Sequence, residues 1–208
     1  MNSTLFASIA ATGFAVAFLH TAMPTHWLPF VLVARGQNWS ARKTLGVTAL
    51  AAIGHVLVTI ALGLAVTAAG LAIGPRLGGV FPYVVGGGVV ALGLFYIARH
   101  FTRPAPKGVE VDGYRSDKAA IIGLVTLLAI APSEFLGVYT SNIIHGWAGF
   151  ALLSVVLGVG TGLGMMLFTG LSLAGANRLK LALLDRYESA FVGVALIVLG
   201  VAVMVFHP

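Results

Sequence analysis

The chain has 208 residues, of which 59% are hydrophobic and 9% are charged, and its formal net charge is +6. Soluble domains carry about 25% charged residues, so this composition excludes a disordered chain, a coiled coil, a nucleic-acid-binding module and a secreted disulfide scaffold. An integral membrane protein remains. Cysteine is absent, which also excludes thiolate metal sites and thiol-relay chemistry.

Six segments are apolar and long enough to cross a bilayer, which takes a helix of about 20 mostly apolar residues. In chain order they are residues 4–22, 45–72, 78–99, 119–140, 148–174 and 188–206. Residues 1–6 contain no lysine or arginine, so we interpret the first segment as a retained helix and not as a cleaved signal peptide. The predicted fold class is all-α, a polytopic membrane protein with six transmembrane helices.

The basic residues predict how these helices are oriented. All lysines and arginines except Arg76 lie in or beside the links that follow the first, third and fifth segments. Basic loops face the cytoplasm, so we expect both termini outside, in the cytoplasmic (inner) membrane of a bacterium. The same residues suit anionic lipid headgroups. The expected partner is therefore the lipid bilayer and not a nucleic acid, and self-association into a homo-oligomer stays open.

A polar link, 101–117, divides the chain into two halves, 1–100 and 118–208, each with three predicted helices. An odd number of helices per half gives the halves opposite orientations, as in inverted-repeat transporters. The first helix of each half carries a deep proline, Pro24 or Pro132. Because proline kinks or breaks a helix, we expect helices one and four to be broken.

Glu134 is the one acidic residue well inside a predicted helix, in the run Ala131-Pro132-Ser133-Glu134. A carboxylate within a bilayer is costly and therefore points to a functional site. The proline removes one backbone N–H and so frees a carbonyl near residue 128. Broken helices at membrane depth are tolerated where they line a polar cavity, so we expect Glu134 to face such a cavity.

Three histidines fall in or at the ends of the first two helices. His20 and His26 are six residues apart, so a straight helix would leave their rings about 240° apart. A break at Pro24 would let both rings turn toward one point. His55 lies on the next helix in an otherwise apolar stretch. We expect these three imidazoles and Glu134 to share one site.

The chemistry of this set is that of a transition-metal site. Neutral imidazole and carboxylate bind borderline divalent ions such as zinc, nickel, cobalt, iron(II) and manganese, whereas calcium and magnesium want more oxygen ligands. Because the imidazoles must be deprotonated to bind a metal, occupancy is coupled to protons. Thr25 and Ser133 are candidates for contacts behind the ligands, and Pro24 and Pro132 are expected to hold the helix breaks open.

The run from His20 to His26, His-Thr-Ala-Met-Pro-Thr-His, resembles the first-helix His-x-x-x-Pro-x-His signature of the nickel/cobalt exporter (NicO-type) family. That family belongs with the lysine-exporter and DsbD/CcdA-like superfamily of membrane proteins with three plus three helices. Gly54-His55 on helix two and the proline deep in helix four are also similar to the family. The resemblance implies six helices, transport, and a membrane site for a divalent metal at His20, His26 and His55.

The sequence departs from the family pattern at three places. Thr25 stands where the family usually has glycine, and the run 131–134 stands where it often has a Pro-Cys-Pro-like element. The family's long histidine-rich loop is missing, since 101–117 contains no histidine. The identity of the metal and the direction of transport therefore stay open.

The predicted function is proton-coupled transport of divalent transition-metal ions by a chain that is not an enzyme. Three alternatives stay open. The first is a membrane metalloenzyme that uses the cluster to activate water. The second is a proton-coupled transporter of a small organic or anionic solute, with the histidines as a proton relay. The third is a non-transporting subunit of a larger assembly.

Several aromatic residues fall near predicted helix ends, where such side chains often anchor a protein at the membrane interface. On this ground we expect Trp27, Trp39, Trp147, Tyr83 and Tyr139 to be interfacial.

Overall fold

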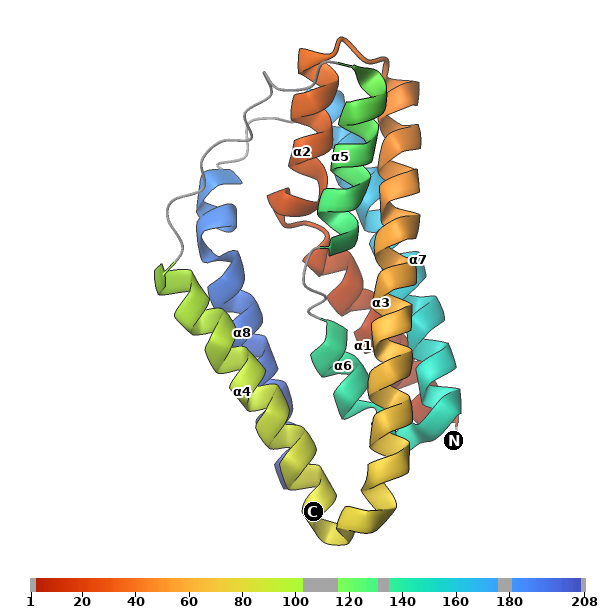
Figure 1. The fold of residues 1–208 in the computed structure, drawn as a ribbon, viewed down its shortest axis with the longest axis vertical. Helices are drawn as coiled ribbons and strands as arrows, with labels where there is room; N and C mark the ends of the chain where they lie inside the picture. The colour runs from red at the N-terminus through yellow and green to blue at the C-terminus, as the bar shows by residue number, and fades with distance from the viewer. Residues whose placement is uncertain (1–2, 103–115, 131–134, 176–180, 207–208) are drawn as a thin grey trace.

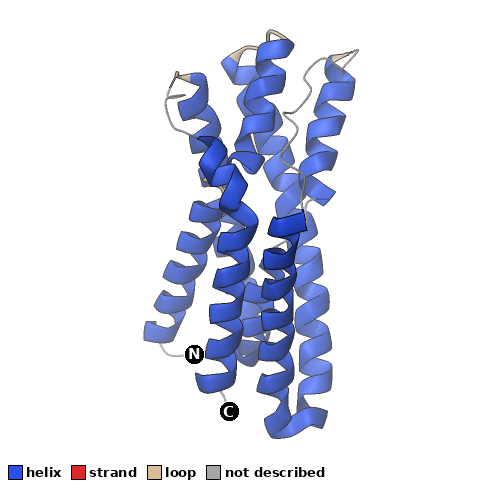
Figure 2. Cartoon of the chain, turned by 90° about the vertical axis from the view of Figure 1, so that its left-hand side faces the viewer, coloured by secondary structure: helices blue, strands red, loops and turns tan. Residues whose placement is uncertain are grey.

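The structure is a computed structural model that describes residues 3–102, 116–130, 135–175 and 181–206. Within these ranges the chain consists of helices joined by short turns, without a β-strand (Figure 2). The all-α fold class predicted from composition is thereby confirmed for the part of the chain that the structure describes.

The helices of the first half follow one another with few residues between them: α1 (Ser3–His20), α2 (Pro24–Gly36), α3 (Ala41–Leu77), the short 3₁₀ helix η1 (Gly78–Val80) and α4 (Phe81–Thr102). The second half contains α5 (Asp117–Ile130), α6 (Phe135–Ser141), the 3₁₀ helix η3 (Ile143–His145), α7 (Gly146–Leu173) and α8 (Leu181–Phe206). Most of the predicted link 101–117 lies outside the described residues.

Two described helical stretches, Ala41–Thr102 and Gly146–Leu173, are long and apolar enough to cross a membrane. A third span is added if the bent pair Ile9–His20 and Pro24–Gly36 is counted as one. The stretch Ala41–Thr102 reverses direction at η1, so that α3 and α4 form the two arms of a V (Figure 1). These features identify the chain as an integral membrane protein.

The break predicted near Pro24 is confirmed, with a bend of 43° between Ile9–His20 and Pro24–Gly36. Met23 has an extended backbone (φ −63°, ψ 133°), as expected for a residue before proline. Pro24 then starts α2, where its missing N–H costs no hydrogen bond.

α2 corrects the sequence analysis, which ended the first helix at residue 22 and assigned the following residues to a link. Its side chains Phe30, Val31 and Val33 are buried, and Phe30 and Val33 pack with residues of α3, α5 and α7. Trp27 is buried rather than interfacial, and its indole N–H donates to the carbonyl of Ala22 at 3.2 Å.

α4 and α8 lie side by side along one edge of the molecule (Figure 1). Their contact depends on glycine, because a Cβ atom at Gly86 would lie 2.6 Å from the Gly200 carbonyl oxygen. A Cβ atom at Gly193 would lie 2.7 Å from the Gly93 oxygen. Small residues at matched positions let membrane helices approach this closely.

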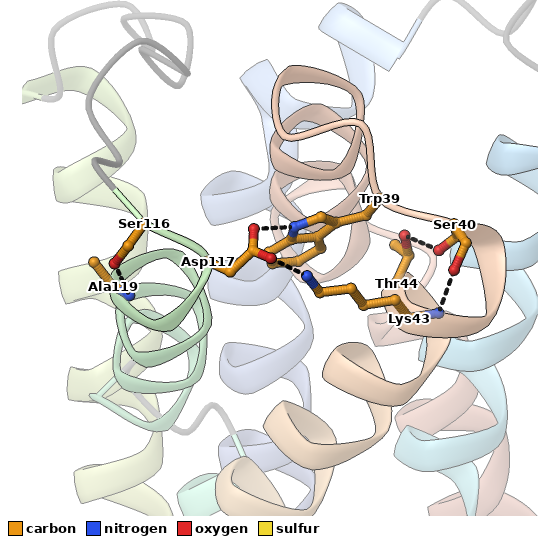
Figure 3. Close-up of polar contacts among 7 residues, drawn as sticks. All are labelled: Trp39, Ser40, Lys43, Thr44, Ser116, Asp117 and Ala119. Carbon is orange, nitrogen blue, oxygen red and sulfur yellow. Dashed lines mark hydrogen bonds and ion pairs between the residues drawn. The ribbon is translucent and has the colours of Figure 1, made fainter.

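The start of α5 is tied to the turn between α2 and α3 (Figure 3). The Trp39 indole N–H donates to Asp117 Oδ1 at 2.7 Å, and Lys43 forms an ion pair with Asp117 Oδ2. The Lys43 ammonium also lies 4.7 Å from the centroid of the Trp39 ring. Beside them, Ser40 caps α3 by accepting a hydrogen bond from the Lys43 backbone N–H at 3.3 Å.

Candidate functional site

The break between α1 and α2 brings His20 and His26 together. His20 is the last residue of α1, and His26 lies in the first turn of α2. Their ring centroids are 4.2 Å apart, with the rings inclined at 69°. On an unbroken helix these rings would point in different directions, so the bend at Met23 and Pro24 creates the pair.

His55 of α3 extends the pair to a row of three imidazoles. Its ring centroid lies 5.9 Å from that of His26, with an interplanar angle of 76°. His26 is 6% exposed and His55 is 2% exposed, so both lie in the interior. The structure thus brings His20, His26 and His55 together through two successive ring contacts, with His26 in the middle. The predicted site as a whole, which includes Glu134, stays a prediction.

A backbone carbonyl of α5 orients the His55 ring. His55 Nδ1 lies 3.0 Å from the carbonyl oxygen of Leu128. A carbonyl oxygen only accepts hydrogen bonds, so Nδ1 carries the proton and Nε2 of the neutral ring carries the lone pair. Leu128 is within the last four residues of α5, whose carbonyls have no partner inside the helix. This is the carbonyl near residue 128 that the sequence analysis expected to be available.

Two further side chains contact the histidines. Thr25 Oγ1 lies 3.3 Å from His26 Nδ1, a position from which it can orient that ring. The ring centroid of Phe135, the first residue of α6, lies 5.0 Å from that of His20. Sequence reasoning missed Phe135, although it follows the 131–134 run directly.

The second-half residues proposed for the site fall in the stretch 131–134. Pro132, Ser133 and Glu134 therefore lie outside the described residues, and their relation to the histidines stays a prediction. Within the described ranges, no group of three or more histidine, aspartate or glutamate residues is arranged to hold a metal ion.

The ring geometry explains why the three histidines are not arranged to hold a metal ion. Two imidazoles that share one tetrahedral metal at about 2.0 Å from each nitrogen have centroids about 5 Å apart. The observed separations, 4.2 Å for His20–His26 and 5.9 Å for His26–His55, lie on either side of this value. The edge-to-face rings would have to rotate to point three nitrogens at one ion. As they stand, they form a row of neighbouring imidazoles.

Tyr139 of α6 corrects a second aromatic prediction. It is 1% exposed, and its hydroxyl lies 2.9 Å from Ser154 Oγ of α7. The sequence placed Tyr139 at the interface, but Gly63 of α3 makes room for it inside, because a Cβ atom at Gly63 would lie 2.6 Å from its ring. Trp147, by contrast, is 53% exposed, as an interfacial residue would be.

The chain was compared with family models, with curated proteins and with solved structures, and none of them matches. The described residues thus form a helical membrane protein in which His20 and His26, at the break between α1 and α2, neighbour the buried His55 of α3.

Proposed function

We propose that the chain transports divalent transition-metal ions across the membrane and is not an enzyme. The observation that carries the proposal is His55, whose Nδ1 donates to the Leu128 carbonyl at 3.0 Å. Histidines that bind metals almost always donate their other ring N–H to a carbonyl or carboxylate. The Nε2 lone pair of His55 can therefore bind a metal ion. The His55 ring neighbours that of His26, which in turn neighbours that of His20.

The proposed site consists of His20, His26, His55 and Glu134. The three imidazoles would take nickel, cobalt, zinc, iron or manganese as cargo, and Glu134 would act as a ligand or exchange a proton. His55 is already neutral, so the proton that an incoming ion displaces would come from a protonated Glu134, or from an imidazole that is protonated before binding, and release of the ion would readmit it. This linkage would couple metal movement to a proton gradient.

We further propose the six-span, inverted-repeat arrangement in a bacterial inner membrane, with both termini outside. Two features support it. Each half begins with two consecutive shorter helices, α1 with α2 and α5 with α6, as expected if helices one and four are broken. The two chain ends lie at the same end of the molecule (Figure 1), as an even number of crossings requires.

A second function is favoured by one observation. The edge-to-face stacking of three imidazoles, at 4.2 and 5.9 Å between centroids, suits proton transfer along the row as well as metal binding. In that case the chain would be a proton-coupled transporter of a small organic or anionic solute.

Metal retention tests the first proposal. The purified protein is exposed to a mixture of zinc, nickel, cobalt, iron(II) and manganese, washed, and analysed by mass spectrometry for bound metal. Wild type is compared with His20→Ala, His26→Ala, His55→Ala and Glu134→Ala. His100→Ala is the matched control, because His100 lies in the last turn of α4, outside the row of imidazoles.

We expect wild type and the control to retain one metal and the four site variants to lose it. The retained metal is then tested for flux into proteoliposomes that contain a metal-sensitive dye. If wild type neither retains nor moves any of the five metals but acidifies the vesicle lumen under a pH gradient, the proton-relay function replaces metal transport.

A further inference from the structure

Exposed basic side chains surround the contact between α3 and α5, at the end of the molecule where both helices begin. Arg42 precedes Lys43 on α3, and Lys118 follows Asp117 on α5; both Arg42 and Lys118 are exposed. Each of them is therefore the chain neighbour of one member of the Lys43–Asp117 ion pair. From this end the two helices lie side by side (Figure 1).

The described residues around this contact do not balance its positive charge. Asp117 is already paired with Lys43. The side chains of Arg42 and Lys118 make no ion pair or hydrogen bond with another described residue. Arg35, in the last turn of α2, is exposed close to the same turn and adds a further positive charge. A surface with this excess of positive charge attracts anionic ligands.

The two helix faces that carry these cations meet each other. Lys118 and Val125 are two helical turns apart and so lie on one face of α5. A Cβ atom at Gly54 of α3 would lie 3.7 Å from Val125 Cγ1, so this face of α5 is turned toward α3. Lys43 reaches α5 through Asp117, and Arg42 stands directly beside it. Arg42 and Lys118 are thus placed to act on one ligand at the seam between the helices.

An exposed apolar face of α3 begins at Arg42. Gly46, Leu50 and Ile53 follow Arg42 at helical spacing and therefore continue one face of the helix. Leu50 is 52% exposed and Ile53 is 58% exposed. A Cβ atom at Gly46 would have nothing within 4 Å, so the surface is open one turn below Arg42. An extended hydrocarbon chain can pass along this face.

Trp39 indicates that these cations lie at the level of the lipid headgroups. Its ring lies 4.7 Å from the Lys43 ammonium, and tryptophan is enriched at the membrane–water interface. A guanidinium group binds phosphate oxygens through two parallel hydrogen bonds. Cations at the interface above an open apolar face are the complement of a phospholipid with an anionic headgroup.

We propose that this surface binds one phospholipid with an anionic headgroup, such as phosphatidylglycerol. Arg42 and Lys118 hold the phosphate, and one acyl chain lies along α3 past Gly46 and Leu50. The lipid is then shared by a helix of each half of the chain. The proposal does not rest on the proposed transport function, because it depends only on the charge and shape of this surface.

Lipid titration followed by native mass spectrometry tests the proposal. The purified full chain is delipidated in a neutral detergent and titrated with phosphatidylglycerol or with the zwitterionic phosphatidylcholine. We expect wild type to bind the first phosphatidylglycerol more tightly than phosphatidylcholine. Arg42→Gln combined with Lys118→Gln should weaken phosphatidylglycerol binding at least about 10-fold, since each basic residue near an anionic membrane surface contributes a factor of about five.

Arg76→Gln is the matched control, because Arg76 is an exposed arginine in the last turn of the same helix. It should bind phosphatidylglycerol like wild type, whereas Arg42→Gln alone should bind it about fivefold more weakly. Equal binding by Arg42→Gln and Arg76→Gln would overturn the site, and so would a wild type that does not prefer phosphatidylglycerol.

A second comparison separates a lipid from a free phosphate ion. Gly46→Leu fills the open surface without changing charge, and Gly162→Leu is its control, since nothing lies within 4 Å of a Cβ atom at either position. We expect Gly46→Leu to weaken phosphatidylglycerol binding about fourfold, because it blocks contact with about one methylene group. If Gly46→Leu binds the lipid like Gly162→Leu and inorganic phosphate displaces the lipid, the surface is a phosphate site and the lipid proposal is wrong.

Discussion

The carbonyl oxygen of Leu128 accepts a hydrogen bond from His55 Nδ1 at 3.0 Å, across the contact between α5 and α3. The two residues are 73 positions apart in the chain and belong to different halves. The end of α5 therefore determines both the tautomer and the orientation of a histidine in the candidate site. This link joins the second half of the chain to the imidazoles of the first.

Substituting His55 by asparagine or by glutamine separates its hydrogen bond to Leu128 from its proposed role as a metal ligand. Asparagine places an amide N–H where Nδ1 stands and can keep the bond to Leu128, whereas glutamine reaches the position of Nε2. We expect both variants to lose metal retention. His55→Asn should stay within about 0.5 kcal/mol of wild type in stability, whereas His55→Gln should lose about 1 kcal/mol because the Leu128 bond is gone.

The measurement is thermal unfolding in detergent alongside metal analysis. Equal stability of the two variants would show that the Leu128 contact does not hold His55 in place.

Thr25 offers a test of support for His26. Its Oγ1 lies 3.3 Å from His26 Nδ1, so Thr25→Val removes a partner that orients the ring. Loss of such a partner typically weakens metal affinity about 10-fold or more. Thr25→Ser keeps the hydroxyl and serves as the control, with affinity close to wild type. Equal metal affinity in the two variants, measured by titration, would assign Thr25 no role.

Gly164 of α7 allows the end of α1, where His20 lies, to pack closely against α7. A Cβ atom there would overlap Thr21 Oγ1 and would lie 3.3 Å from the Phe18 carbonyl oxygen. We expect Gly164→Ala to cost about 1–3 kcal/mol by overpacking and to reduce metal retention, because Thr21 directly follows His20.

Gly162→Ala is the control on the same helix, since nothing lies within 4 Å of a Cβ atom at that position. Its stability should stay within about 0.5 kcal/mol of wild type. A similar loss in both variants, measured by thermal unfolding, would mean that helix flexibility and not the contact with α1 is responsible.

We expect the contacts of Asp117 to make a pH-dependent contribution to the stability of the fold. Hydrogen bonds from Lys43 and then from Trp39 favour its charged form and lower the pKa of its carboxyl below the ordinary value. A carboxyl with a lowered folded-state pKa stabilises the fold above the unfolded-state pKa, which is about 3.9. This contribution disappears as the pH falls through the lower, folded-state value.

Asp117→Asn should therefore lower the apparent melting temperature slightly at neutral pH, and the difference from wild type should shrink toward pH 3. High salt should weaken the effect, because the pair is exposed and screened. Lys43→Gln should behave like Asp117→Asn. A difference that is the same at pH 7 and pH 3 would contradict the ion-pair origin.

The first half of the site was largely predictable from the residues. Proline at position 24 and histidines on either side of it indicate a broken helix, because proline cannot continue a helical hydrogen-bond ladder. His55 stands out as a polar side chain in an apolar segment. The stretch 131–134, with Pro132, Ser133 and Glu134, stays a prediction because it lies outside the described residues.

The sequence misled where burial depends on a distant partner. The sequence analysis assigned the residues of α2 to a link, since Trp27 and Arg35 lie close together there. In the structure α2 packs against α3, α5 and α7. Tyr139 reads as an interfacial residue, but Gly63, far away in the chain, leaves space for its ring. Tryptophan and tyrosine occur near helix ends both at the membrane interface and in buried contacts, so the local sequence pattern alone does not distinguish the two locations.

The class of protein, the break near Pro24 and the three histidines in apolar segments follow from the residues alone, because hydrophobicity and proline act locally along the chain. Which of these groups meet follows from the packing of the helices. The hydrogen bond from His55 to the Leu128 carbonyl and the packing of the Tyr139 ring against Gly63 each join helices that are remote in sequence. Contacts of this kind depend on how helices pack against one another, which no single segment encodes.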